Sequence, residues 1–208
     1  MFLVAIDWSK NGSGITKYNT LTGKMDYLTF SSVKKNVSDH IKFLPKKDFK
    51  NDWDQIKFMT DIVLDFIPKG SPIIIEGYSF GSVGSVFDIA ESCGVMKWRL
   101  ITEHDCKFME VPPTTIKKWA TGSGGADKVK MTNAYFNLTS IPFELTHLSK
   151  FKSPQNDIID SFWMLDLLIN KTNNTPKYVK FISDKVNEKS KDVLTSEFIS
   201  IEDRLSFV

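Results

Sequence analysis

The sequence predicts an α/β fold in which a mixed five-stranded sheet is flanked by helices. Short apolar runs rich in β-branched residues recur in the first 111 residues of the 208-residue chain, and each fits a buried strand. Other segments place apolar residues every three or four positions, as amphipathic helices do. The most apolar of these, residues 153–170, has a surface wide enough to pack deeply against a sheet.

The first three expected strands form a meander, and the last two each follow a helix. Gly12 and Gly14 come after the first strand and permit a tight turn. Thr22 and Gly23 form the turn between the second and third strands. The five expected strands cover residues 2–6, 15–19, 25–30, 72–76 and 107–111.

Five helices are expected from apolar spacing and from signals at their ends. Asn51 or Asp52 can cap the first of them. Asn156 can cap the last helix, and Pro154 just upstream prevents an earlier helix from running into it. The expected helices cover residues 53–67, 83–104, 113–120, 126–138 and 153–170.

The composition fits one domain over residues 1–170, followed by a charged extension over residues 171–208 that packs on the domain or trails from it. The net charge is only +2, so a basic surface would have to come from charge segregation. Cys93 and Cys106 lack metal-type spacing, which suggests a reducing compartment. No N-terminal signal or membrane span is recognisable, so we expect a soluble cytoplasmic protein.

Residues 31–51 are polar and rich in lysine, and we expect an irregular connection there. A run of this kind is most often a solvated surface, but it can also form a strip that contacts phosphates. Both interpretations remain open on the sequence alone. The lysines are Lys34, Lys35, Lys42, Lys46, Lys47 and Lys50.

Four acidic residues occupy positions that suggest a shared site. Asp7 and Glu76 each end a buried strand, where ligands bind in α/β sheets. Asp157 and Asp160 are three residues apart, so they share one face of a helix. Capping a turn or lying on the surface are the ordinary alternatives. Together with the order of elements, these acids predict a ribonuclease H-like fold whose carboxylates hold two Mg²⁺ ions, an all-oxygen set that this ion prefers.

Two glycine-rich stretches accompany these acids. The first carries Tyr78 and Phe80, which can be core or lid residues or can stack on a nucleobase. The second precedes an expected helix, and free amides with nearby ammonium groups there could bind an anion. The lysines around the second stretch are Lys117, Lys118, Lys128 and Lys130.

Four segments in this order and spacing resemble the RuvC family of Holliday-junction resolvases, in its bacteriophage branch, over residues 1–170. They read VAIDWS, IIIEGYSFGS, VPPTTIKKWATGSGGADK and NDIIDSFWML. The resemblance implies that Asp7, Glu76, Asp157 and Asp160 are catalytic and bind Mg²⁺, for which Mn²⁺ can substitute. It also implies DNA contacts by Lys117, Lys118 and Lys128, an aromatic residue (Phe80 or Tyr78) that enters the junction, and a homodimer formed through helix 83–104.

The expected function is therefore a metal-dependent endonuclease that resolves four-way or other branched DNA by symmetric hydrolysis, with a metal-activated water as nucleophile. If a phage encodes the protein, it would act in the host cytoplasm. The alternatives are a ribonuclease H-like nuclease that cuts RNA–DNA hybrids and a junction-binding protein that does not cleave. An actin-like ATPase is a further alternative, but it needs two lobes, for which 208 residues are too few.

Overall fold

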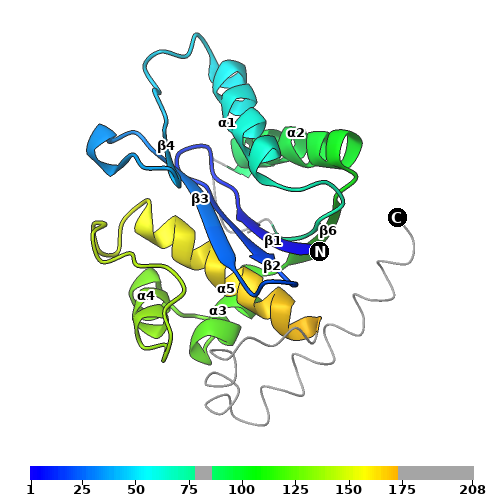
Figure 1. Cartoon of the computed structure of the whole chain (residues 1–208). Helices are drawn as coiled ribbons and strands as arrows, with labels where there is room; N and C mark the ends of the chain where they lie inside the picture. The colour runs from blue at the N-terminus through cyan, green and yellow to red at the C-terminus, as the bar shows by residue number, and fades with distance from the viewer. Residues whose placement is uncertain (78–85, 173–208) are drawn as a thin grey trace.

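The computed structural model describes residues 1–77 and 86–172, and they form a mixed sheet between two layers of helices (Figure 1). The strands follow the order β4-β3-β2-β1-β5-β6 across the sheet. The first three pair antiparallel as the expected meander, and the other neighbouring pairs are parallel. The strands are β1 (Phe2–Asp7), β2 (Gly14–Asn19), β3 (Met25–Ser31), β4 (Ile41–Phe43), β5 (Pro72–Glu76) and β6 (Lys107–Val111).

Strand β4 was not expected from the sequence. Its presence shows that two predictions were wrong: the sheet has six strands rather than five, and residues 31–51 are not wholly irregular. It pairs parallel with β3 and aligns Ile41 with Thr29. Ile41 is fully buried, so one apolar side chain and three backbone pairs suffice to extend the sheet. A short 3₁₀ turn, Lys34–Asn36, precedes it. So short a strand carries no hydrophobic alternation that could be recognised among lysines.

The five expected helices are present, with shifted ends. Asn51 caps the first, because its side chain accepts a hydrogen bond from the Asp54 amide. The expected start of the second at residue 83 lies outside the described residues. The helices are α1 (Asp52–Phe66), α2 (Val86–His104), α3 (Pro113–Thr121), α4 (Lys128–Phe136) and α5 (Gln155–Lys171).

The sheet is buried on both faces, and the side chains of β1 show how. Leu3 and Ala5 join the core under α3, α4 and α5, whereas Val4 and Ile6 join the core under α1 and α2. Successive side chains of a strand point to opposite faces, so a continuous apolar run serves two cores. Figure 1 shows α1 and α2 on one face and α5 with α3 and α4 on the other.

Helix α5 is almost entirely enclosed, as its apolar surface predicts. Asp160 is the one residue between Gln155 and Ile169 that is not buried. The expected cap at Asn156 is wrong, because the helix begins at Gln155 and Pro154 occupies the N-cap position. The Asn156 side chain instead donates to the carbonyl of Phe151 at 2.9 Å, closing the preceding turn.

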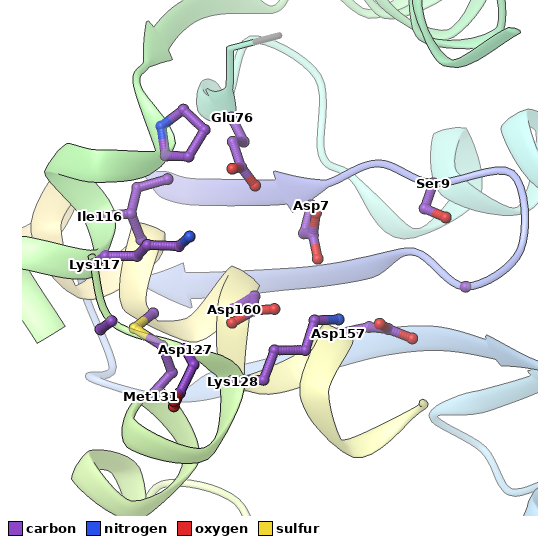
Figure 2. A pocket seen from close by; sticks show the side chains of 13 residues that line it. Asp7, Ser9, Glu76, Ile116, Lys117, Asp127, Lys128, Met131, Asp157 and Asp160 are labelled. Atoms are coloured by element: carbon purple, nitrogen blue, oxygen red, sulfur yellow. The ribbon is translucent and has the colours of Figure 1, made fainter. Parts of the chain in front are cut away.

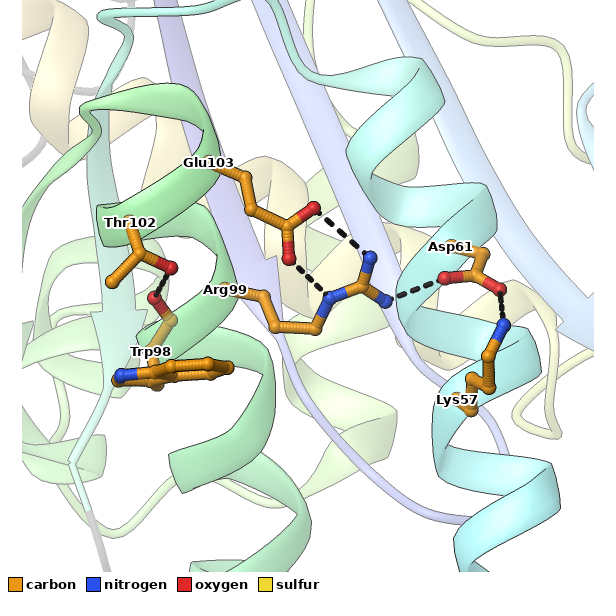
Figure 3. Close-up of polar contacts among 6 residues, drawn as sticks. All are labelled: Lys57, Asp61, Trp98, Arg99, Thr102 and Glu103. Carbon is orange, nitrogen blue, oxygen red and sulfur yellow. Dashed lines mark hydrogen bonds and ion pairs between the residues drawn. The ribbon is translucent and has the colours of Figure 1, made fainter.

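Helices α1 and α2 are joined by charged side chains at their exposed sides. Arg99 donates to Glu103 of its own helix and reaches across to Asp61 of α1, which also accepts from Lys57 (Figure 3). In the described part of the chain no helix combines the length and the hydropathy needed to cross a membrane.

Candidate functional site

A pocket of about 490 Å³ opens where β1 and β5 end and α5 begins (Figure 2). The structure brings together all four acids that the sequence singled out: Asp7, Glu76, Asp157 and Asp160 all line this pocket. Its remaining walls come from α3, from the start of α4 and from the loop between β1 and β2. These further lining residues are Ser9, Gly12, Pro113, Ile116, Lys117, Ala126, Asp127, Lys128 and Met131.

The two strand acids meet because β1 and β5 are adjacent and parallel. Ile6 is in register with Ile75, so Asp7 and Glu76 come next on neighbouring strands at the same edge of the sheet. On the other side of β5, the amide of Gly77 donates to the Val111 carbonyl of β6 at 2.9 Å and extends the β5–β6 pairing beyond Glu76. The apolar runs before each acid hold the two carboxylates at this edge.

The helix acids are placed by a very close contact between β2 and α5. A Cβ atom at Gly14 would overlap the backbone carbonyl of Asp157, so only glycine permits this approach. One turn further along, the Thr16 hydroxyl donates to the Ser161 carbonyl at 2.9 Å. Neither Gly12 nor Gly14 has positive φ. These two glycines of the predicted turn are therefore needed because a side chain would not fit, and not for their backbone conformation.

The Asp157 carboxylate has a dedicated partner. The Ser153 hydroxyl donates to its Oδ2 at 2.5 Å. A Cβ atom at Gly12 would lie 2.6 Å from that same Oδ2 and 2.7 Å from the Ser153 oxygen. Glycine at position 12 therefore leaves the space that this hydrogen bond occupies.

All four carboxyl groups have raised pKa values, and burial is the largest cause for each of them. Burial raises the pKa of Asp7 well above its usual value, and repulsion from the other three acids raises it further. Burial raises the pKa of Asp160 to about 7. Burial also raises the pKa values of Glu76 and Asp157. Partly buried like charges in one pocket are typical of functional sites and of sites that bind cations.

Two of the predicted DNA-binding lysines face these acids, and the third does not. Lys128 lowers the pKa of all four carboxyls, and Lys117 lowers those of Glu76 and Asp160, partly offsetting the effect of burial. Figure 2 shows their ammonium groups reaching into the pocket. Lys118 does not line it. Tyr78 and Phe80 lie outside the described residues.

The helix that carries Lys117 is anchored in the core. The indole of Trp119 on α3 donates to Asp166 Oδ2 on α5 at 3.0 Å. Asp166 is fully buried, and its Oδ1 has no hydrogen-bond partner in the described structure. Burial raises the pKa of Asp166 to about 7. The sequence reasoning missed this acid because it lies within an apolar helical pattern.

At the start of α4, where an anion site is expected, one of the helix amides is already occupied. The helix begins at Lys128, and the Asp127 side chain accepts from the Lys130 amide at 2.8 Å, so the chain caps this end itself. Asp127, Ser9 and Ser153 were all missed as residues of the site or its support. An acid before a helical run is a recognisable cap signal, whereas Ser9 has no local signal.

The donor set fits a hard divalent cation, since all four acids offer carboxylate oxygens. Their side chains do not converge on one point as they stand. In residues 1–77 and 86–172, no three His, Cys, Asp or Glu side chains are close enough together to hold one ion. Asp157, for example, is turned toward Ser153. A cation that binds here would have to draw these side chains together.

Comparison with known proteins identifies the fold. The sequence matches no protein-family model, and a search of the curated proteins finds no match. The structure is similar to that of RuvC from Thermus thermophilus, with a TM-score of 0.52 at 12% identity, covering 84% of this chain and 98% of that chain. The structure of T. thermophilus RuvC in complex with a Holliday junction substrate is similar with a TM-score of 0.50 at 11% identity, covering 84% of this chain and 97% of that chain. The chain therefore has the RuvC-like, ribonuclease H-like fold that its sequence motifs implied.

Proposed function

We propose that this protein is a metal-dependent endonuclease that cleaves phosphodiester bonds in branched DNA, with the four-way junction as its main substrate. The observation that carries the proposal is the meeting of four carboxylates from β1, β5 and α5 with two lysines in one pocket. The structural similarity to a RuvC that binds a Holliday junction supports the choice of substrate.

In this proposal the acids and the lysines of the pocket have different roles in phosphodiester hydrolysis. Asp7, Glu76, Asp157 and Asp160 would hold the metal, with two ions per site in our proposal. Divalent cations such as Mg²⁺ or Mn²⁺ supply an activated water and stabilise the leaving oxygen. Lys117 and Lys128 face the carboxylates, where ammonium groups can bind the phosphate and offset its negative charge.

Symmetric cleavage of a four-way junction needs two such sites, and α2 offers a surface for a second copy. Phe87, Trp98 and Ile101 are 84%, 64% and 52% exposed on this helix. Their spacing of eleven and three residues places them along one helical face. Large apolar side chains exposed in a row are typical of an interface. We propose that two copies pair through this face.

The test is incubation of the purified protein and Mg²⁺ with a synthetic four-way junction, a flap, an RNA–DNA hybrid and a linear duplex. We expect paired, symmetric nicks in the junction. Asp7→Asn and Asp160→Asn should each lower the rate by at least about 10²-fold, because each removes a charge from the site, while junction binding persists. EDTA should stop cleavage, and added Mg²⁺ or Mn²⁺ should restore it.

Asp65→Asn is the matched control, since Asp65 is exposed on α1 and does not line the pocket. It should cut at the wild-type rate. Preferential cleavage of the hybrid would point to the alternative function, a nuclease of RNA–DNA hybrids. Junction binding without any cleavage would support a non-cleaving binding protein. Full activity in the Asp7 and Asp160 variants would disprove the site.

A further inference from the structure

We infer that the segment over residues 31–51 is a second surface for the phosphate backbone of DNA, lying beside the mouth of the pocket. The inference rests on the proposed function, because it extends the same site. The segment holds six lysines against two aspartates, in a chain whose net charge is only +2. Positive charge is thus segregated into one stretch of the chain, which is the electrostatic footprint of a phosphate-binding surface.

The segment contacts the loop that forms one end of the pocket. Lys46 Nζ donates to Asn11 Oδ1 at 2.7 Å. Asn11 lies between Ser9 and Gly12, and both of these line the pocket. Gln55 of α1 also holds this loop, because its amide donates to the Lys10 carbonyl at 2.6 Å. The ammonium of Lys46 is therefore tied to the rim of the site.

The lysines near the rim are displayed on an ordered support. Leu44 is fully buried, and its amide donates to the Ser31 carbonyl at 2.8 Å. Phe49 packs on Phe58 of α1, with ring centroids 5.4 Å apart. These anchors bracket the exposed side chains of Lys46 and Lys47, and exposed Lys50 follows directly. Holding the backbone on both sides reduces the entropy cost when a ligand orders the lysines.

These lysines also keep their charge available. None of the six forms an ion pair with any residue in the described parts of the chain, and Lys46 is bonded to a neutral amide. Lysines of neighbouring elements behave differently: Lys10 pairs with Asp52, and Lys57 pairs with Asp61. An ammonium group without a carboxylate partner can exchange its counterions for a phosphate without first breaking an ion pair.

The position of the segment complements the other lysines of the site. In Figure 2, Ser9 and Lys117 lie at opposite ends of the pocket, with Asp7 between them. Lys117 and Lys128 can therefore hold one side of a strand that enters the pocket, while Lys46, Lys47 and Lys50 hold the backbone beyond the opposite rim. The partner is the sugar-phosphate backbone, so this surface adds affinity without reading sequence.

The experiment measures binding of a four-way junction as a function of salt, in an Asp7→Asn background that does not cleave. The variant K46Q/K47Q/K50Q removes the three lysines near the rim. K24Q/K69Q/K107Q is the matched control, because these exposed lysines lie at the opposite end of the sheet. Lys24 and Lys69 precede β3 and β5, and Lys107 is the first residue of β6. We expect the slope of log K against log salt to fall by about 0.9 for each phosphate that a lysine no longer neutralises, and only in the first variant.

A third variant, K46R/K47R/K50R, keeps the charge and should keep the wild-type slope. Equal slopes for the rim variant and the control would overturn this inference, while cleavage by the wild-type protein would leave the proposed function standing. A wild-type protein that neither binds nor cuts the junction would overturn both. Circular dichroism of each variant checks that the fold is retained.

Discussion

At the scale of single residues, the carboxyl groups with raised pKa values fall into two kinds. The acids of the pocket face Lys117 and Lys128 and border open space, so a cation or a phosphate can reach them. Asp166 is enclosed, and among the described residues only the Trp119 indole donates a hydrogen bond to its carboxyl group. Burial raises the pKa values in both cases, but only the first arrangement offers a ligand access. A raised pKa therefore marks a functional site only where the geometry supports it.

Asp166 should make the stability of the protein depend on pH. Its pKa of about 7 in the folded state lies above the ordinary value of 3.8, so the folded state binds more protons between these values. The free energy of unfolding should fall as pH rises through this range. Asp166→Asn removes this contribution. The free energy of unfolding of the variant, relative to that of the wild type, should therefore rise by up to about 4 kcal/mol between pH 4 and pH 7.

Urea unfolding at several pH values, without metal, measures this difference. The pocket acids make both proteins pH-dependent, so the informative quantity is the difference between variant and wild type. A constant difference for Asp166→Asn across this pH range would mean that Asp166 is ionised in the folded protein at neutral pH.

At the scale of elements, the contact between β2 and α5 places half of the acids. Gly14 and Thr16 of β2 lie against the backbone of Asp157 and Ser161. These contacts join parts of the chain more than 140 residues apart, so no local pattern reveals them. The sequence could predict that Asp157 and Asp160 share a face of a helix. It could not predict the contacts that fix the distance between this helix and the sheet.

Gly14→Ala should therefore damage both stability and the site. The added methyl group overlaps the Asp157 carbonyl, so α5 has to move away from the sheet. We expect a loss of about 1–3 kcal/mol in the free energy of unfolding, as is typical of overpacked cores. Gly125→Ala is the control, since a Cβ atom there has no neighbour within 4 Å. Denaturant titration of both variants checks the difference, and equal stabilities would contradict the close packing.

Elements with strong local signals were predicted well. Apolar runs identified five strands, helical spacing identified five helices, and Asn51 was correctly named as a possible cap. The errors arose where tertiary contacts decide the structure. One is β4, which exists through pairing with β3, and another is the start of α5, where Asn156 bonds backward to Phe151. The assignment of the four acids to one pocket followed from strand order, while their catalytic roles stay predictions.

At the scale of the whole molecule, the exposed face of α2 determines the proposed assembly. Trp98→Glu places a charge at the centre of this face, so it should weaken dimerisation by at least about tenfold. Light scattering coupled to gel filtration measures the mass at micromolar concentration. Trp53→Glu is the matched control, because Trp53 is 53% exposed on α1. A wild-type protein that is monomeric at all concentrations would contradict the proposed dimer.

The charge cluster of the pocket draws on both ends of the described chain, with Asp7 near its start and two acids on α5. A ribosome releases the chain from the N-terminus, so β1 and β5 emerge long before α5 does. A nascent chain that still lacks this helix also lacks two carboxylates and most of the core beneath them. Under the proposed function, a chain from which α5 has not yet emerged thus cannot nick nucleic acid.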